Sequence, residues 1–207
     1  MIIAPGSSLI FAGDSITECG RQGSNLGQGF VMMVDAYLKA KRGGSRIRVE
    51  NVGVGGNTAR DLSSRWDDDV LEKEPDWVSL LIGVNDVWRQ FDRYLEVENH
   101  VRLPEYRSAV NHMVGTARDS GAQVVVMSPF FVEPNLDDPM RSLVEEYALS
   151  AMEVAKKHEA IFVDIQSELD EMVSHVPVMS ITNDRVHLGS AGHMRIALAF
   201  LESVRAL

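Results

Sequence analysis

The sequence predicts a three-layer α/β fold, in which a five-stranded parallel sheet lies between two layers of helices. Two observations indicate this fold: short β-rich runs alternate with longer helical stretches, and at least three of the runs are almost continuously apolar. Apolar runs are typical of strands that helices cover on both faces, and strands that alternate with helices form parallel sheets with right-handed crossovers. The sequence contains no internal repeat, low-complexity tract or linker, so one domain is expected over residues 1–207.

The expected elements follow from local composition and spacing. The expected strands are residues 9–12, 47–52, 77–82, 124–127 and 161–163. Apolar residues recur at i, i+3, i+4 and i+7, the spacing of an amphipathic helix, in residues 30–38, 110–117 and 194–201. Gly121 stands shortly after the second of these stretches, where a glycine commonly ends a helix.

The composition narrows the classes of function. Hydrophobic residues make up 45% of the chain and charged residues 24%, as in ordinary globular domains. The net charge of −10 argues against nucleic acid and anionic membranes as partners, because proteins bind both through basic patches. No apolar run approaches the roughly 18 residues that a membrane span needs.

Cysteine content and the N-terminal segment favour a cytoplasmic protein. Cys19 is the single cysteine, so no intrachain disulfide can form. The segment from Met1 to Ser8 has no basic residues ahead of its short apolar stretch, unlike a signal peptide. A disulfide-free exported enzyme is the alternative.

Four polar segments are placed where an active site is expected. In a parallel sheet, active sites gather in loops beyond the carboxyl ends of the strands. Three of the segments follow the first three expected strands, and the fourth precedes the last helix. They are residues 13–17 (GDSIT), 53–58 (GVGGNT), 83–89 (GVNDVWR) and 184–187 (DRVH).

Together these segments supply the groups that acyl transfer requires. Ser15 can attack a carbonyl if a base takes its proton, and His187 can be that base because an imidazole titrates near neutral pH. Asp184, three residues earlier, can orient the His187 ring. A negatively charged oxygen that forms during the reaction needs hydrogen-bond donors. The expected donors are the backbone N–H groups of Ser15 and Gly56 and the side-chain amide of Asn85.

The four segments resemble the four blocks of the SGNH or GDSL hydrolases, which are named for a serine, a glycine, an asparagine and a histidine. Gly13-Asp14-Ser15-Ile16 is similar to the first block, with Ile16 where leucine is usual; residues 51–58, 83–86 and 184–187 are similar to the others. The order and the separation of the blocks also match. The resemblance implies a flavodoxin-like αβα sandwich, no metal or other cofactor, a Ser15–His187–Asp184 triad and an oxyanion hole of Ser15, Gly56 and Asn85.

A closer similarity is to the intracellular bacterial acetylxylan esterases within this family. Residues 13–21, 83–90 and 138–141 carry it. It implies a cytoplasmic homo-oligomer that removes acetyl groups from short xylo-oligosaccharides. Two departures bear on substrate fit and on the oligomeric arrangement: the loop 22–29 is shorter, and Asn183 stands where an aromatic residue is usual.

Other functions are compatible with parts of the pattern. A short-chain esterase, a thioesterase or a lysophospholipase would use the same groups, although no long apolar loop suggests an acyl-chain tunnel. A non-catalytic flavodoxin-like binding module would leave the coincidence of the four segments unexplained. Taken singly, Ser15 could be a helix N-cap and Asn85 an Asx-turn residue.

Several neighbouring residues receive no catalytic role. Asp14 and Asp86 are expected to order their loops. Residues 67–69, three aspartates, are expected to be a solvated helix end and not a metal site. Four residues after the third and fourth strands could either wall a substrate pocket or pack in the core: Trp88, Arg89, Phe130 and Phe131. The remaining histidines are expected to be structural or solvated: His100, His112, His158, His175 and His193.

Overall fold

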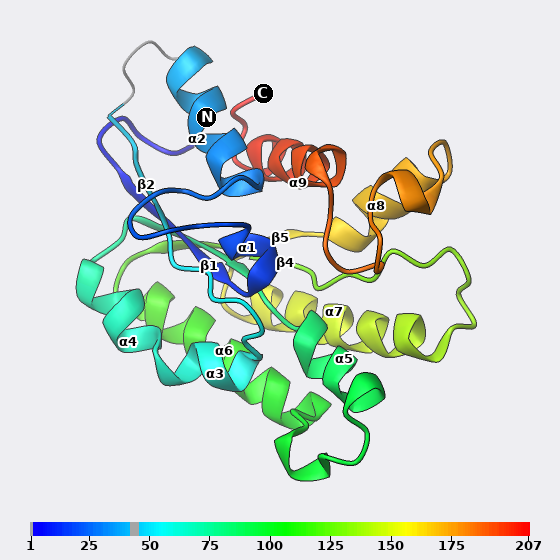
Figure 1. The fold of residues 1–207 in the computed structure, drawn as a ribbon. Coiled ribbons are helices and arrows are strands. Elements are labelled where there is room, and N and C mark those ends of the chain that lie inside the picture. Colours follow the sequence, from blue (N-terminus) through cyan, green and yellow to red (C-terminus); the bar gives the residue numbers. More distant parts are fainter. Residues whose placement is uncertain (1, 42–45) are drawn as a thin grey trace.

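The computed structural model describes residues 2–41 and 46–207 of the chain. In this part, five parallel strands form one sheet in the order β2-β1-β3-β4-β5 (Figure 1). The strands are β1 (Ser8–Gly13), β2 (Arg48–Asn51), β3 (Trp77–Leu81), β4 (Gln123–Met127) and β5 (Ile161–Val163). Each overlaps its expected range, so the predicted α/β fold is confirmed. Met1, which begins the N-terminal segment considered above, lies outside the described residues.

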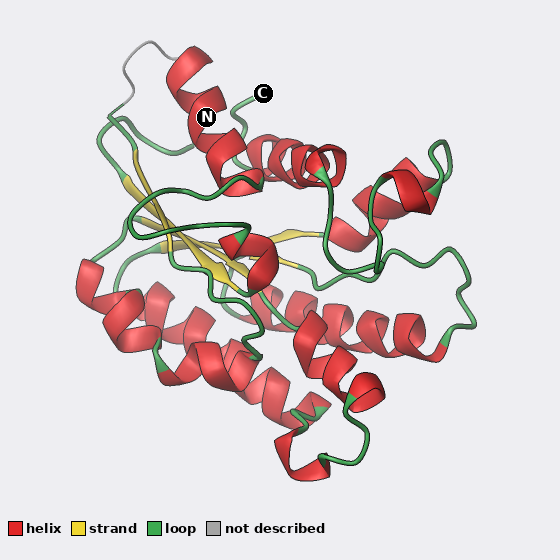
Figure 2. Cartoon of the chain, viewed as in Figure 1, coloured by secondary structure: helices red, strands yellow, loops and turns green. Residues whose placement is uncertain are grey.

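Helices cover both faces of the sheet, as Figure 2 shows. α2 and α9 pack together on one face, and α6 packs against both α3 and α7 on the other. No helix in residues 2–41 or 46–207 is long and apolar enough to cross a membrane. The helices are α1 (Ser15–Glu18), α2 (Phe30–Lys41), α3 (Ala59–Ser64), α4 (Trp66–Asp69), α5 (Val84–Asp92), α6 (Leu103–Asp119), α7 (Pro139–Lys157), α8 (Ile165–Val173) and α9 (Ser190–Ser203).

Local signals begin and end the long helices. Asp138 caps α7 by accepting hydrogen bonds from the N–H groups of Met140 at 2.9 Å and Arg141 at 3.0 Å. Gly121 follows α6 with a φ of 95°, in the left-handed region that favours glycine, as its place in the sequence predicted.

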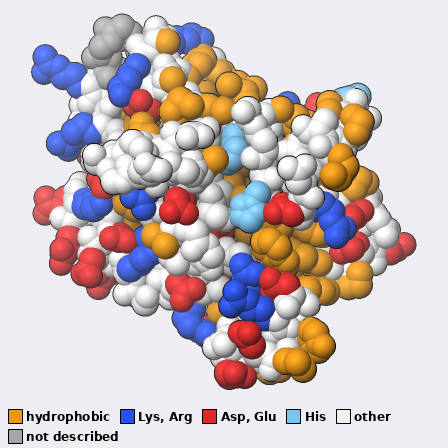
Figure 3. Space-filling model, viewed as in Figure 1, with side chains coloured by type: hydrophobic (Ala, Val, Ile, Leu, Met, Phe, Trp, Pro, Cys, Tyr) orange, Lys and Arg blue, Asp and Glu red, His pale blue; other side chains and the backbone are white. Residues whose placement is uncertain are grey.

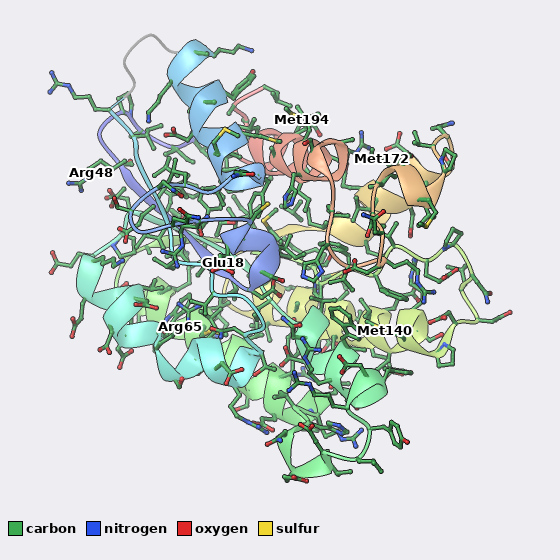
Figure 4. All side chains as sticks on the ribbon, viewed as in Figure 1. Glu18, Arg48, Arg65, Met140, Met172 and Met194 are labelled. Atoms are coloured by element: carbon green, nitrogen blue, oxygen red, sulfur yellow. The ribbon has the colours of Figure 1, made fainter. Side chains whose placement is uncertain are left out.

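The expected apolar stripe of α9 is partly wrong. Met194, labelled in Figure 4, is 45% exposed. The buried face instead centres on Ile196, Ala197 and Phe200. The reason is tertiary: the Phe200 ring packs 4.9 Å from the Phe11 ring of β1, and this contact sets which side of α9 faces the sheet.

The strand order reverses direction at β1, which makes the carboxyl ends of β1 and β3 a topological switch point. The chain runs from β1 to β2 at one edge, and then crosses to β3 on the other side of β1. The loops after β1 and β3 therefore leave the sheet in different directions. Ligand sites of open parallel sheets lie at such a switch point.

The segment after β3 is a helix and not the expected loop. α5 begins at Val84, directly after Gly83, whose φ is 130°. A Cβ on Gly83 would lie 2.8 Å from a ring atom of Tyr106, so glycine lets the chain turn at once into the helix. As a result, Asn85 and Asp86 lie in the first helical turn, at the carboxyl edge of the sheet.

Candidate active site

Ser15 lies immediately beyond β1, as the first residue of the short helix α1. The preceding residue, Asp14, caps this helix with its buried side chain, which accepts a hydrogen bond from the Ile16 N–H at 2.9 Å. The alternative that Ser15 is itself the N-cap is therefore wrong, while the expectation that Asp14 orders the loop is confirmed. The Ser15 hydroxyl remains free to contact another side chain.

That side chain is His187, from a segment 172 residues further along the chain. Ser15 Oγ lies 3.0 Å from Nε2 of His187, and on the other side of the ring Nδ1 lies 2.6 Å from Oδ2 of Asp184. A carboxylate only accepts hydrogen bonds, so Nδ1 carries a proton and donates a hydrogen bond to Asp184. When Nδ1 carries the only ring proton, the Nε2 lone pair faces the Ser15 hydroxyl.

Hydrogen bonds keep Asp184 ionised. Burial raises the pKa of its carboxyl, but hydrogen bonds from the His187 ring and from the N–H groups of His187 and Val186, together with attraction to the His187 charge, outweigh burial and bring the pKa to about 2. The two N–H groups donate to Oδ1 at 2.7 and 3.0 Å. Oδ1 of Asp184 thus binds the backbone of its own loop, and Oδ2 binds the His187 ring.

The loop that carries Asp184 and His187 is fastened to the segment after β4. The Val132 N–H donates to the Arg185 carbonyl at 2.9 Å, and the Arg185 side chain lies 2.5 Å from the Glu133 carboxylate. The Arg185 guanidinium also lies over the Phe131 ring, 4.8 Å from its centroid. These contacts, which the sequence did not reveal, hold the segment of the exposed His187 against the body of the protein.

The glycine-rich loop after β2 lies against Ser15. A Cβ on Gly55 would be 3.9 Å from the Ser15 Cβ and 2.7 Å from Oε2 of Glu18, which Figure 4 labels on α1. Gly56 has a φ of 79°, in the left-handed region that favours glycine. Among the described residues, neither the Ser15 N–H nor the Gly56 N–H has a hydrogen-bond acceptor. Both amides can therefore serve a bound molecule.

Asn85 joins α5 to this loop. It is 2% exposed, and its Nδ2 donates to the carbonyl of Asn57, the residue after Gly56, at 3.0 Å. Its Oδ1 accepts a hydrogen bond from Arg89 at 3.2 Å. The Asx-turn alternative is therefore wrong, because both polar atoms of the side chain bond outside their own turn. An amide nitrogen has two hydrogens, so one remains for a bound molecule.

Asp86 fastens the same loop from inside the protein. Its two carboxylate oxygens lie 3.0 and 3.1 Å from the N–H of Ala59, the first residue of α3. Burial raises the pKa of Asp86 to about 8 despite this hydrogen bond, and burial also raises the pKa of Asp14 to about 7. Asp86 therefore orders the loop, as expected.

Arg65 is a further organising residue, and it was missed in the sequence. Its guanidinium donates to the carbonyls of Val52 at 2.9 Å and Gly13 at 3.2 Å, and to the Asn57 side chain at 2.8 Å (labelled in Figure 4). It therefore ties the ends of β1 and β2 to the glycine-rich loop after β2. No sequence signal could have found it, since an arginine between two helices is usually solvated.

A cavity of about 350 Å³ opens beside the Asp184–His187 loop. Its apolar wall contains Trp88, Phe91, Phe131 and Met140, and its polar wall contains Asp92, Asp138 and Arg185. Figure 3 shows hydrophobic side chains gathered over α7, next to a histidine near the centre of this face. The Trp88 and His187 ring centroids are 5.9 Å apart in an edge-to-face arrangement. The cavity therefore adjoins His187.

The four residues whose role the sequence left open divide between these environments. Trp88 and Phe131 line the cavity, and Phe131 also packs in the core at 3% exposure, whereas Phe130 only packs in the core. Arg89 lies in a separate polar hollow of about 220 Å³, which Gly56 also lines.

Other titratable groups lie outside the Ser15–His187–Asp184 chain. His193 is 4% exposed; its Nε2 lies 3.2 Å from the Cys19 sulfur and its Nδ1 accepts a hydrogen bond from the Phe30 N–H at 3.3 Å. Of the three aspartates at 67–69, Asp69 pairs with Arg65 at 2.5 Å. In residues 2–41 and 46–207, no group of three His, Cys, Asp or Glu side chains is placed to hold a metal ion.

The fold and this site are those of a carboxylic ester hydrolase built on a parallel α/β sheet. The chain belongs to the GDSL-like lipase/acylhydrolase family, whose model matches residues 11–195. The resemblance that the four sequence blocks indicated is therefore confirmed.

Two relatives are similar over nearly the whole chain. An acetylxylan esterase from Geobacillus stearothermophilus is 41% identical over 99% of this chain and 96% of its own length, and its crystal structure superposes with a TM-score of 0.96. LAE5, an α/β hydrolase enzyme from the metagenome of Lake Arreo, Spain, is 38% identical, with a TM-score of 0.97 and coverage of 100% of this chain and 99% of its own. Solved catalytic mutants of the Geobacillus enzyme replace a serine, an aspartate or a histidine by alanine.

Proposed function

We propose that this protein is a serine esterase that removes acetyl groups from acetylated xylo-oligosaccharides through an acyl-enzyme on Ser15. The observation that carries the proposal is the hydrogen-bonded chain from Ser15 through His187 to Asp184, next to an aromatic cavity. The similarity to an acetylxylan esterase over 99% of the chain supports the substrate class.

In the first half of the reaction, Nε2 of His187 takes the Ser15 proton while Oγ attacks the acetyl carbonyl carbon. Asp184 stabilises the imidazolium that forms. The carbonyl oxygen becomes negatively charged and accepts hydrogen bonds from the N–H groups of Ser15 and Gly56 and from the Asn85 side chain. His187 then gives its proton to the sugar oxygen, the carbon–oxygen bond breaks, and acetyl-Ser15 remains.

In the second half, a water molecule takes the place of the sugar. His187 removes a proton from the water as the water attacks the acetyl carbonyl carbon, and the same donors hold the oxyanion. Collapse of this intermediate breaks the bond to Ser15, whose Oγ recovers the proton from His187, and acetate leaves. The exposure of His187, whose side chain is 48% accessible, lets water reach this position.

The aromatic cavity supports a sugar as the group that leaves. Aromatic rings present flat apolar faces, and Trp88, Phe91 and Phe131 bring three of them to one hollow. Asp92, Asp138 and Arg185 supply polar atoms at the same place, as hydroxyl-rich ligands require. The acetyl group itself needs little room on the opposite side of the serine.

Labelling and a substrate panel test this proposal. A serine-directed organophosphate should add one label to the wild type and none to Ser15→Ala. Acetyl esters should exceed butyryl esters in kcat/KM by roughly 5- to 150-fold, because overpacking a close-packed site costs about 1–3 kcal/mol. Acetylated xylobiose should exceed ethyl acetate, since only a sugar site adds stabilisation from the ring. Faster turnover of octanoyl or phospholipid esters would refute the carbohydrate substrate while keeping the serine mechanism.

We also propose that the protein works in the cytoplasm as a homo-oligomer. An unpaired cysteine, Cys19, is typical of reducing compartments. Tyr94, Leu95 and Val97 expose 57–79% of their surface on one short segment, which supports an interface between copies. Light scattering of the purified protein, with Leu95→Glu as the comparison, would detect it, and an unchanged monomeric mass for both would contradict it.

A further inference from the structure

We propose that Arg89 is a positioning residue, which holds the side-chain amide of Asn85 in the one orientation that the oxyanion hole can use. This inference rests on the oxyanion role proposed above for Asn85. The two residues lie one turn apart on α5, and Nη2 of Arg89 donates a hydrogen bond to Oδ1 of Asn85 at 3.2 Å.

An amide side chain can turn over without changing its shape. Rotation by half a turn exchanges the oxygen and the nitrogen of Asn85, which have nearly the same size. In the observed orientation Nδ2 faces the Asn57 carbonyl at 3.0 Å and has a second hydrogen for the substrate. The opposite orientation would bring two oxygens together at Asn57 and offer an acceptor to a negatively charged oxygen. Catalysis therefore depends on which orientation is populated.

The positive charge of the Arg89 guanidinium favours one of these two orientations of the Asn85 amide. A guanidinium has donors only, so it bonds to Oδ1 and would repel the NH₂ group of a turned amide. At 2% exposure, Asn85 has little contact with water that could compensate for a wrong pairing. The donor on Oδ1 also polarises the amide, which strengthens the remaining N–H as a donor to the oxyanion.

Arg89 is itself held in place. Nη1 donates to the Asp92 carboxylate, and the guanidinium carbon lies 4.9 Å from the centroid of the Trp88 ring. The Arg89 side chain is 21% exposed. Contacts on both sides therefore fix the guanidinium and define where it presents Nη2.

The test is a double-mutant cycle between Arg89 and Asn85, with 4-nitrophenyl acetate as the substrate. Arg89→Met keeps a long side chain over Trp88 but removes every donor. We expect kcat to fall about 10- to 100-fold, the range for losing a hydrogen bond to a charged group, with KM within about twofold. In an Asn85→Ala background the same substitution should leave kcat unchanged, because Arg89 then has no amide to orient. Arg89→Lys, which restores a charged donor, should recover part of the lost kcat.

Arg93→Met is the matched control. Arg93 lines the same polar hollow and is 56% exposed, and its ion pair is with Glu96, at 3.9 Å. Because it does not contact Asn85, its loss should leave kcat and KM near the wild-type values. If Arg89→Met fails to fold, the same cycle with Arg89→Gln decides, since glutamine is shorter and uncharged but keeps a polar end at this partly exposed position.

The outcomes separate this inference from the function on which it rests. If Asn85→Ala is impaired while Arg89→Met keeps the wild-type kcat, the positioning role is overturned and the oxyanion role stands. A loss at Arg89 that persists in the Asn85→Ala background, or one confined to KM, also overturns the positioning role. If Asn85→Ala keeps full kcat, the oxyanion role itself is wrong, and the positioning role with it.

Discussion

Two pairs of a nucleophile and an imidazole are built from the same two segments of this chain. Ser15 Oγ lies 3.0 Å from Nε2 of His187, and the Cys19 sulfur lies 3.2 Å from Nε2 of His193. Both contacts use the Nε2 atom of the imidazole, and the two distances are almost the same. The group on the far side of each ring is different, and it sets the chemistry of the pair.

In each imidazole, the group that is hydrogen-bonded to Nδ1 determines which ring nitrogen carries the proton. Nδ1 of His187 meets a carboxylate, so the proton is on Nδ1 and Nε2 is a base. Nδ1 of His193 instead accepts from the Phe30 N–H, so the proton is on Nε2 and points at the sulfur. Burial, together with the nearby His187, lowers the pKa of His193 to about 4. A short distance between nucleophile and imidazole is therefore not enough for catalysis.

Replacing each nucleophile by alanine tests this comparison with the largest expected effect. Ser15→Ala should lower kcat about 10⁴- to 10⁶-fold with no change in fold, as loss of a triad residue does. Cys19→Ala should leave kcat within a few-fold of the wild type, because its imidazole cannot act as a base. Steady-state kinetics and thermal melts on both variants measure this, and similar losses in the two would break the distinction.

Replacing Asp184 by asparagine makes the surroundings of His187 resemble those of His193, and so tests the role of the carboxylate. In Asp184→Asn, the amide can donate to Nδ1 as the Phe30 N–H does in the other pair, so kcat should fall about 10³- to 10⁴-fold, less than in His187→Ala. Because the pKa of Asp184 is about 2, its carboxylate is kept at every pH above about 3 and cannot give kcat/KM an acid limb there; we expect such a limb to depend on His187. An acid limb that persists in a His187 variant with residual activity would contradict this assignment.

The oxyanion donors are a second difference between the pairs, with a smaller effect. Asn85→Ala should lower kcat about 10²- to 10³-fold, roughly 3–4 kcal/mol, with a smaller change in KM. Asn85→Asp is the useful companion, since a carboxylate in place of the amide would repel the oxyanion. A change confined to KM would mean that Asn85 binds the ground state of the substrate.

The smallest effect on activity is expected at His193, where the readout is stability. A buried histidine with a lowered pKa binds fewer protons when folded than when unfolded, so it favours folding above about pH 6.5 and loses that contribution as the pH falls toward 4. The difference is roughly 3 kcal/mol, at about 1.36 kcal/mol for each pKa unit. His193→Gln should therefore melt with a weaker pH dependence between pH 6.5 and 4, while kcat stays within a few-fold.

Two buried carboxyl groups also make the stability depend on pH in this range, so the Tm values of wild type and His193→Gln must be compared at the same pH. Burial raises the pKa of Asp14 to about 7 and of Asp86 to about 8, so their contribution to folding is complete below about pH 4 and decreases as the pH rises. Their effect is opposite in sign to that of His193. The difference in Tm between wild type and His193→Gln at the same pH isolates the histidine, and a constant difference would contradict its buried, neutral state.

The sequence by itself determined the features that depend on neighbouring residues or on block order. The apolar runs predicted β1, β3 and β4 to within one residue at each end, because buried parallel strands need continuous apolar sequence. The order of the four polar segments indicated the family, and Asp184 stands close enough to His187 in sequence to share one turn. Ser15 was found through its place after the first strand.

Only the tertiary structure decided which side each residue faces and what it touches. Both Phe130 and Phe131 are buried, but only Phe131 lines the cavity, and nothing local distinguishes two adjacent phenylalanines. The sequence predicted Asn85 as an oxyanion donor but left open an Asx turn, because asparagine commonly makes its own turn. Its actual partners, Asn57 and Arg89, depend on a helix that begins directly after β3. Such contacts arise from packing between distant elements, which local spacing cannot specify.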